Sequence, residues 1–267
     1  MSLEINLAGK RALVTGASDG LGKAIAITLA KAGCDVVGTG RVAPDHERAL
    51  ELLQHLEAQG HRSHYLEGDL SLKQTPAQHV ADAVERLGGL DIVISNAGLN
   101  IFKGVESCSE EDWEYNIQLN LSSHWRLGQA ALPELRKNKG VFQVMNSNHA
   151  YSTIAGCFPY QTSKTALLGL VQSCAIEWGP DVRVVGIAPG FIDTPGNQSW
   201  FDQFPNPEEE KRQTEQRHLT RSIGKAEDVG ALCCYLASPY ARFITGNTIL
   251  MDGGRSAMMQ DGHPFHS

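Results

Sequence analysis

Short apolar runs alternate with longer helical patterns along most of this chain, and this order limits the folds that it can adopt. Runs rich in β-branched residues predict strands at 11–15, 35–39, 64–67, 90–94, 141–145, 182–187 and 248–251. Apolar periodicity predicts helices between them at 21–32, 45–59, 76–87, 110–136, 160–179 and 226–237. Repeated strand–helix–strand order favours right-handed crossovers and a parallel sheet with helices on both faces. We therefore expect an α/β fold of the doubly wound (Rossmann) type, with a parallel seven-stranded sheet.

Composition is that of an ordinary globular protein, with 42% hydrophobic and 20% charged residues. The 267 residues contain no Gly/Ser-rich linker, charge block or fixed repeat, so we expect a single domain over 1–267. A net charge of −7 disfavours nucleic acid and anionic membranes as partners, and no apolar run approaches the roughly 20 residues of a membrane span. The start of the chain lacks the pattern of a secretory signal. Six cysteines without a C-x-x-C pair indicate reduced thiols and no metal site, so we expect a cytoplasmic protein.

Three stretches depart from the regular alternation. Pro133 indicates a break near the end of the helical stretch 110–136. The segment 194–222 is predicted to be irregular, because it is polar and contains three prolines. Aromatic residues alternate with polar ones there, which favours a lid that closes over a small ligand. Residues 260–267 are expected to form an exposed tail.

A glycine-rich turn, Thr15 to Gly22, follows the first strand and opens the first helix. Its glycines let the backbone turn tightly and approach a pyrophosphate, while the helix N-terminus offers free N–H groups. Gly22 would also allow close contact between helix and sheet. Glycine triplets are common in ordinary turns, but the position between the first strand and the first helix predicts a dinucleotide site.

Tyr160 and Lys164 are four residues apart at the start of a predicted helix, so their side chains share one face. An ammonium near a phenol favours the phenolate and lowers the pKa of the tyrosine from about 10 toward neutral pH. Such a pair can give and take a proton. An ordinary helix surface would show the same two residues, and the pair by itself favours that simpler interpretation.

The spacing G-x-x-x-G-x-G together with Tyr160-x-x-x-Lys164 resembles the short-chain dehydrogenase/reductase family, over nearly the whole chain. The resemblance implies an NAD(P)-dependent oxidoreductase that interconverts a secondary alcohol and a ketone. It implies that Ser147 binds the substrate oxygen and that Tyr160 transfers the proton. Lys164 would lower the pKa of Tyr160 and hold the nicotinamide ribose, while Asn120 supports a water that links Lys164 to solvent. Relatives are mostly homotetramers, paired through the helices at 110–136 and 160–179.

The same resemblance implies a set of cofactor contacts along the carboxyl ends of the strands. These are Gly16, Ser18, Asp19, Gly20, Leu21, Gly22, Arg41, Asp69, Leu70, Asn96, Ala97, Gly98, Tyr160, Lys164, Pro189, Gly190, Ile192 and Thr194. Ser147, His149 and Tyr160 would contact the substrate. For His149 the alternative is a partly exposed loop position, and for Trp200 the alternatives are packing under the lid and stacking on a sugar ring.

Three positions depart from the usual pattern of the family. Ser95 replaces the first Asn of N-N-A-G, and Asn146 precedes Ser147 where N-I-S-S is common. Val185 occupies a position where Asn is frequent. These changes remove none of the proposed chemical groups, but they leave the geometry of the substrate pocket unpredicted.

The end of the second strand bears on the choice between NADP and NAD. Gly40 occupies the place of the acid that binds the ribose of NAD, and Arg41 follows it. A guanidinium can pair with the 2′-phosphate of NADP, so NADP is favoured. Asp19 in the glycine-rich turn would repel that phosphate, and stacking of Arg41 on the adenine is the alternative role, so NAD stays open.

The segments 32–38 and 42–44 look like those of family members that act on sugar acids. Polar candidates for the pocket suit a polyhydroxylated substrate; they are Asn146, Asn148, His149, Asn197 and Gln198. The alternative within the enzyme class is a 3-oxoacyl thioester reductase, which would require a basic surface for a carrier protein. A dinucleotide-binding regulator without turnover is the alternative from another class. Regulators of this kind typically lose the tyrosine or the lysine, whereas this chain retains both.

Overall fold

The computed structural model describes residues 4–258, so the tail expected at 260–267 lies outside the described residues. Seven parallel strands form one sheet in the order β3-β2-β1-β4-β5-β6-β9. Their bounds are β1 Arg11–Thr15, β2 Asp35–Gly40, β3 Ser63–Glu67, β4 Ile92–Ser95, β5 Val141–Met145, β6 Arg183–Pro189 and β9 Thr248–Met251. The strand order reverses between β1 and β4, which defines a doubly wound sheet. The predicted fold class is confirmed.

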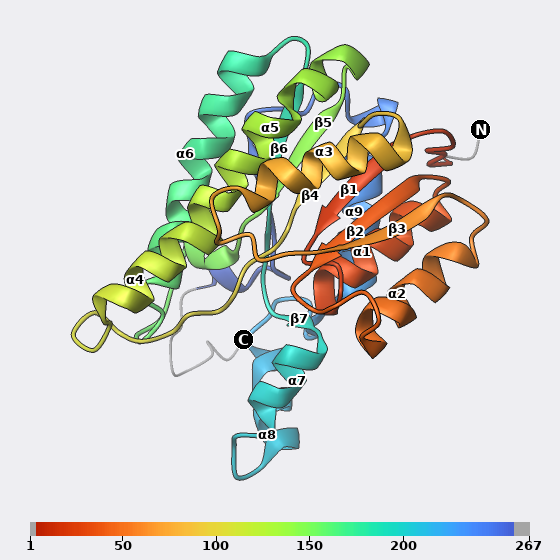
Figure 1. The fold of residues 1–267 in the computed structure, drawn as a ribbon. Coiled ribbons are helices and arrows are strands. Elements are labelled where there is room, and N and C mark those ends of the chain that lie inside the picture. The colour runs from red at the N-terminus through yellow and green to blue at the C-terminus, as the bar shows by residue number, and fades with distance from the viewer. Residues whose placement is uncertain (1–3, 259–267) are drawn as a thin grey trace.

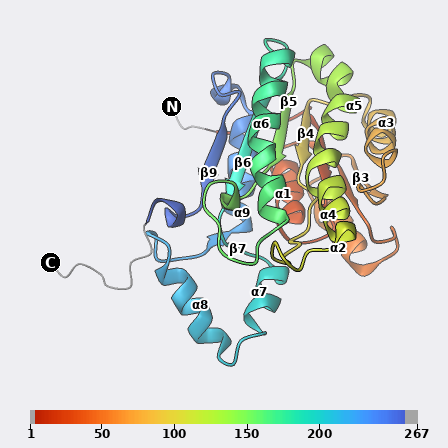
Figure 2. The ribbon, with the colours of Figure 1, turned by 90° about the vertical axis from the view of Figure 1, so that its left-hand side faces the viewer.

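Helices cover both faces of the sheet (Figures 1 and 2). One layer contains α1 Gly20–Lys31, α2 Glu47–Glu57 and α9 Ala226–Ala237, and the other contains α3 Thr75–Leu87, α5 Ser123–Asn138 and α6 Tyr160–Trp178. Successive residues of a strand point to opposite faces, so Val14 of β1 packs in the first core and Leu13 in the second. Burial on both faces explains why the strands are almost continuously apolar.

The long helical stretch is broken, but not at Pro133. Helix α4 covers Glu110–Ile117, a π-helical segment covers Gln118–Ser122, and α5 then continues to Asn138 with Pro133 inside it. Helix α5 tolerates the loss of one backbone hydrogen bond at Pro133, because Ala131 and Leu135 on either side are fully buried. Single π-helical turns are frequent at functional sites, and this one carries Asn120.

The segment expected to be irregular contains two helices, α7 Pro195–Phe201 and α8 Pro207–Gln216. Each helix begins with a proline directly after a residue whose side chain caps it. Thr194 Oγ1 accepts from the Asn197 N–H at 3.3 Å, and Asn206 Oδ1 accepts from the Glu209 N–H at 3.2 Å. The first helical position needs no N–H donor, so proline is favourable there. The prolines therefore start helices in this segment, and the prediction of an irregular loop is wrong.

Both helices project beyond the carboxyl ends of the strands (Figures 1 and 2). A small parallel pair, β7 Ile192–Asp193 with β8 Gly224–Lys225, joins the two ends of this projection. Aromatic rings give it a core of its own, with Trp200 4.7 Å from Phe204 and 5.2 Å from Phe201 between ring centroids. None of the helices in the described part of the chain is both long enough and apolar enough to cross a membrane.

Candidate active site

The glycine-rich turn forms a backbone cradle at the start of α1. Gly16 has φ +68°, a conformation that favours glycine, and a side chain on Gly22 would collide with the Gly16 carbonyl oxygen. Asp19 caps α1, since its Oδ1 accepts from the Gly20 N–H at 2.7 Å. The cradle is thus shaped by residues that cannot carry a larger side chain, and it leaves room for the backbone to approach a ligand.

The segment after β4 fixes the cradle to the middle of the sheet. The N–H groups of Asn96 and Ala97 both donate to Thr15 Oγ1, at 2.9 and 3.0 Å. The Asn96 side chain donates in turn to the Thr15 carbonyl oxygen at 2.9 Å. These bonds hold the ends of β1 and β4 in register, where the reversal of strand order opens a crevice.

A cleft of about 1550 Å³ runs from this cradle along the carboxyl ends of the strands. Most of the predicted site residues line it, namely Gly16, Asp19, Leu21, Gly22, Asn96, Ala97, Gly98, Ser147, His149, Tyr160, Lys164, Pro189, Gly190, Ile192 and Thr194. The predicted residues that do not line it are Ser18, Gly20, Arg41, Asp69, Leu70 and Asn120. A long cleft that begins at a glycine cradle on a helix N-terminus fits an extended dinucleotide.

Tyr160 is the first residue of α6 and Lys164 lies one turn later, and both side chains are almost fully buried. Lys164 Nζ donates to the Met145 carbonyl oxygen at 2.9 Å and lies 5.6 Å from the centre of the Tyr160 ring. Burial raises the pKa of Tyr160 to about 12 and lowers the pKa of Lys164 to about 7. Our expectation that Lys164 lowers the pKa of Tyr160 is therefore wrong for the protein alone. Burial disfavours the charged form of each residue, and it is the largest cause of both shifts.

Ser147 and His149 lie beside Tyr160 on the loop after β5. Burial dominates the pKa of Tyr160, but a hydrogen bond with Ser147 opposes it. Ser147 Oγ also accepts from the His149 N–H at 3.2 Å, which fixes the turn. The His149 ring is 6.0 Å from the Tyr160 ring between centroids, and Phe102 is within 5.9 Å of both rings. His149 is thus half-buried and lines the cleft next to the proposed proton donor.

Asn120 does not reach the cleft, because its side chain is fully buried behind the wall. Its Oδ1 accepts from the Leu99 N–H and its Nδ2 donates to the Leu99 carbonyl oxygen, both at 2.9 Å. Asn120 Nδ2 also donates to Asn116 Oδ1 at 2.8 Å, and Asn116 Nδ2 donates to the Pro159 carbonyl oxygen at 3.1 Å. Asn116 therefore connects Asn120 to the residue before Tyr160. Sequence analysis missed it, although its spacing of four from Asn120 was a signal.

A second buried pair explains one departure from the family pattern. Ser95 Oγ and His124 Nδ1 are 2.7 Å apart, and both residues are buried. Burial, with the nearby charge of Lys164 as the second cause, lowers the pKa of His124 well below its ordinary value. The serine at position 95 thus provides a hydrogen-bond partner for a neutral histidine behind Lys164. Sequence analysis did not single out His124, because its position depends on how α5 packs against the sheet.

The polar groups that would meet an adenosine ribose lie around the end of β2, next to the glycine cradle. A side chain on Gly40 would lie within 2.5 Å of the Tyr65 hydroxyl and 2.7 Å of Ser18 Oγ, so an acid has no room there. Arg41 is exposed, and its Nη1 donates to the Tyr115 hydroxyl at 3.3 Å. Arg48 Nη1 pairs with Asp19 Oδ2 at 3.3 Å. Arg48, which sequence analysis did not single out, therefore compensates the negative charge of Asp19.

Comparisons with known proteins agree with this geometry. A family profile described as enoyl-(acyl carrier protein) reductase matches residues 16–256. Human dehydrogenase/reductase SDR family member 4 is 36% identical over 254 residues, which cover 93% of this chain and 88% of that protein. The chain belongs to the short-chain dehydrogenase/reductase family.

Two solved structures of the family extend the comparison. A 3-oxoacyl (acyl-carrier-protein) reductase from Agrobacterium tumefaciens, with NADP bound, has a TM-score of 0.87 and 30% identity. The match covers 95% of this chain and 97% of that one. An aldohexose dehydrogenase from Thermoplasma acidophilum has a TM-score of 0.86 and 26% identity, over 97% of this chain and 98% of its own. The family therefore holds members with unlike substrates on the same fold.

Proposed function

We propose that this short-chain dehydrogenase/reductase uses NADP to interconvert a secondary alcohol and a ketone on a polyhydroxylated small molecule. One observation carries the proposal: Ser147, Tyr160 and Lys164 converge on one wall of a cleft that begins at the glycine cradle. The hydroxyl groups of Ser147 and Tyr160 lie side by side, so a substrate oxygen could form a hydrogen bond with each of them. One of these hydroxyl groups, that of Tyr160, can transfer a proton.

The chain's own residues would position the substrate and move the proton. Ser147 Oγ donates to the substrate oxygen, and Tyr160 Oη gives a proton to it in reduction or takes one in oxidation. A bound nicotinamide supplies or accepts the hydride. With a pKa of about 12, Tyr160 carries its proton at neutral pH and is ready to act as the donor. Lys164 Nζ lies over the Tyr160 ring, and Asn120 holds the backbone of Leu99, which lines the same cleft as Lys164.

Three features support NADP over NAD. Gly40 has no room for the acidic side chain that would bind the ribose of NAD. Arg41 is exposed beside it, and a guanidinium can bind a phosphate with two parallel hydrogen bonds. The repulsion that Asp19 would exert on the phosphate is offset by its pairing with Arg48. One of the structural relatives contains NADP, which is consistent with this choice.

The lining of the cleft supports a polyhydroxylated substrate. Asn148, Asn197 and Gln203 supply polar groups, and Trp200 presents part of its ring to the same space. An aldohexose dehydrogenase shares the fold. A 3-oxoacyl thioester reductase is the second candidate, because the relative with NADP has that activity in its name. It would require a basic docking surface near the cleft, whereas the first turn of α8 contains Glu208, Glu209 and Glu210.

A cofactor-oxidation assay tests the proposal. Purified protein would be mixed with NADPH or NADH and a panel of keto-sugars, keto-uronates and 3-oxoacyl thioesters. We expect turnover of a keto-sugar or keto-uronate with NADPH, and slower turnover with NADH. Faster turnover of the thioesters would favour the second candidate. Binding of NADPH without turnover of any panel member would indicate a dinucleotide-binding regulator.

We also propose that the chain forms a homotetramer through α5 and α6. Trp125 on α5 is 47% exposed and Ile176 on α6 is 81% exposed. Large apolar side chains at these positions suit a protein interface. Sedimentation of the purified protein would test this, and a monomer would contradict it.

A further inference from the structure

Arg255 lines the cleft, and no acidic residue within 4–258 forms an ion pair with it. It follows β9, in the short helical turn Arg255–Ala257, and it is half-buried. Within residues 4–258 its guanidinium makes no ion pair and no side-chain hydrogen bond. Burial lowers the pKa of Arg255, and the like charge of Arg217 adds to this effect. Holding a cation out of water beside another cation costs free energy unless an anion compensates it.

The two acids nearest to Arg255 are already engaged. Both oxygens of Asp252 accept backbone N–H groups of the following turn, from Gly254 at 3.0 Å and from Ser256 at 2.8 Å. Glu210 on α8 pairs with Arg217 at 3.2 Å. Among residues 4–258, the acids near Arg255 are thus engaged elsewhere, and its guanidinium is available to a ligand.

Arg255 also lies close to the proposed site of proton transfer. Asn148 Nδ2 donates to Ser256 Oγ at 3.5 Å, so the Arg255 turn contacts the loop that carries Ser147. The charge of Arg255 contributes to lowering the pKa of His149, after the larger effect of burial. The His149 ring is 6.0 Å from the Tyr160 ring, and all three residues line one cleft, so a single ligand there has access to both Tyr160 and Arg255. Thr214 Oγ1, which is buried and has no hydrogen-bond partner in the described structure, lines the same cleft.

We propose that Arg255 binds a carboxylate of the substrate, which makes the substrate a hydroxy acid or an oxo acid. The inference rests on the proposed function, since it assumes that the oxidised carbon lies at Tyr160. A carboxylate matches the planar guanidinium and can take two parallel hydrogen bonds from it. A phosphate dianion suits this position less well, because Arg217 is already paired and the charges of Glu210 and Asp252 are near. Asn148 and Thr214 then remain for the hydroxyl groups of the acid.

Calorimetric titration with D-gluconate and D-gluconamide tests this independently of turnover. The two probes share a carbon skeleton, and only the first has a carboxylate. With NADPH present, which cannot oxidise either probe, we expect the wild-type protein to bind gluconate about 10- to 100-fold more tightly than gluconamide, the range for a charge-assisted hydrogen bond. Arg255→Gln should remove the difference, and Arg255→Lys should keep part of it. Arg212→Gln is the matched control, because Arg212 is exposed on α8 and pairs with Glu209.

Kinetics with the same probes separates the two proposals. In Arg255→Gln we expect KM to rise for acid substrates, with kcat little changed and with neutral alcohols unaffected. Equal binding of both probes by the wild-type protein, or an equal loss for both in Arg255→Gln, would overturn the carboxylate assignment. Selective binding of gluconate without oxidation of any alcohol would instead leave Arg255 in place and defeat the proposed function. Oxidation of neutral alcohols alone would support the proposed function and contradict the carboxylate assignment of Arg255.

Discussion

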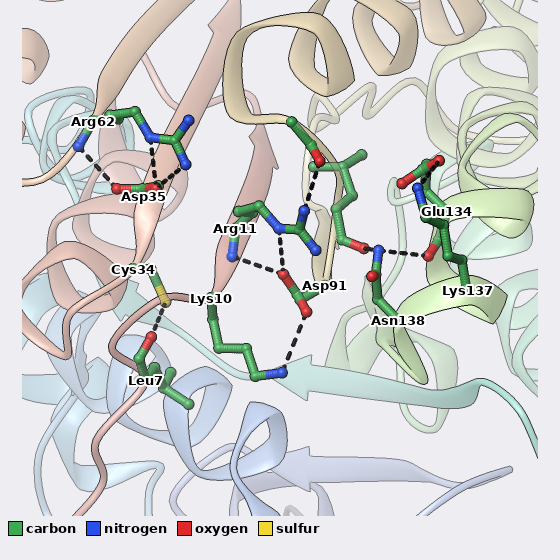
Figure 3. A network of polar contacts seen from close by, with 12 residues as sticks. Leu7, Lys10, Arg11, Cys34, Asp35, Arg62, Asp91, Glu134, Lys137 and Asn138 are labelled. Carbon is green, nitrogen blue, oxygen red and sulfur yellow. Dashed lines mark hydrogen bonds and ion pairs between the residues drawn. The ribbon is translucent and has the colours of Figure 1, made fainter.

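Charged side chains are paired differently at the two ends of the strands, which we call the amino edge and the carboxyl edge of the sheet. At the amino ends of the strands, Asp91 accepts from Arg11 Nε at 2.7 Å, from the Arg11 N–H at 3.1 Å and from Lys10 Nζ at 3.2 Å (Figure 3). Asp35 pairs with Arg62 in the same way, with 2.7 Å between the charged atoms. At the carboxyl ends, Lys164 has one hydrogen bond and Arg255 has none from its side chain within residues 4–258.

This difference indicates that charged residues at the amino edge stabilise the fold, whereas those at the carboxyl edge take part in binding and catalysis. Paired charges at the amino edge stabilise the fold, because each buried polar group has found its partner. Unpaired groups at the carboxyl edge cost stability, and natural proteins accept such costs where a ligand is to be bound. Substitutions at the first edge should therefore change the free energy of unfolding, and those at the second should change activity.

The largest effect is expected for Tyr160→Phe. Loss of a positioned proton donor should lower kcat by about 100- to 10,000-fold, since this is the usual contribution of general acid–base catalysis. The free energy of unfolding should change little, because the ring stays in place. NADPH oxidation and urea unfolding measure the two quantities.

Tyr151→Phe is the control for this experiment. Tyr151 donates to the Thr248 carbonyl oxygen at 3.1 Å and does not line the cleft. The Tyr151→Phe variant should keep the kcat of the wild-type protein. Full activity of Tyr160→Phe would refute the assignment of the proton donor.

Asp91→Asn should produce the converse result. Removing the charge leaves Arg11 and Lys10 without their partner, and we expect a loss of about 3 kcal/mol in unfolding free energy, with kcat/KM unchanged. This is at the low end for a buried pair, because Lys10 is half exposed. Asp35→Asn should cost about 1 kcal/mol or less, since its partner Arg62 is 55% exposed. Equal losses in the two variants would contradict the role of burial.

The effect of Asp91 should depend on pH in a defined direction. Burial tends to raise the pKa of Asp91, but its bonds with Arg11 and Lys10 together lower it below the ordinary 3.8. A carboxyl with a lowered pKa in the folded state stabilises the protein above 3.8 and loses that contribution as pH falls further. The difference between the wild-type protein and Asp91→Asn in urea unfolding should therefore be full at neutral pH and shrink below pH 3.8. A difference that grows in acid would contradict this sign.

Arg41→Ala tests whether a residue at the carboxyl edge sets the preference for NADPH over NADH. It should reduce the preference for NADPH over NADH by about 10- to 100-fold, as expected for the loss of a charge-assisted hydrogen bond to phosphate. Arg48→Ala should have a smaller effect, because Arg48 acts by compensating Asp19. Arg62→Ala, at the amino edge, is the control. The ratio of kcat/KM for the two cofactors measures all three, and an unchanged ratio in Arg41→Ala would favour NAD or a stacking role.

Asn116→Ala should lower turnover much less than Tyr160→Phe, and it should change both stability and activity. Asn116 is fully buried and links Asn120 to the Pro159 carbonyl oxygen. We expect a loss of about 1–3 kcal/mol in unfolding free energy, from the unsatisfied partners that remain. A fall in kcat of less than about tenfold should accompany it, since Tyr160 would be held less firmly. Unfolding and turnover assays on one preparation would show whether the two losses coincide.

The sheet was predictable because local patterns and burial agree there. The helix predicted at 226–237 from apolar periodicity and the strand predicted at 248–251 from a short apolar run have the bounds of α9 and β9. The cradle was predictable for a related reason, since only glycine fits at Gly16 and Gly22. Family spacing placed Ser147 and Tyr160, and the structure brings them to one wall of the cleft.

Other features depend on contacts that no local pattern contains. Proline is common both in loops and at the first position of a helix, so Pro195 and Pro207 had two interpretations and the caps at Thr194 and Asn206 decided between them. The pKa of Tyr160 was predicted in the wrong direction, because the spacing shows the neighbouring charge and not the burial. Arg255 was missed for a similar reason: only the tertiary structure shows that its neighbouring acids are engaged.

Thr194 lies between the glycine cradle and the start of the projecting helix α7. It caps α7 through Asn197, lines the cleft, and lies 3.8 Å from where a side chain on Gly20 would begin. A dinucleotide held in the cradle would therefore touch the residue from which the projecting helices start. We expect the nucleotide to bind first and the second reactant to follow, so that product-inhibition patterns of an ordered mechanism would be observed.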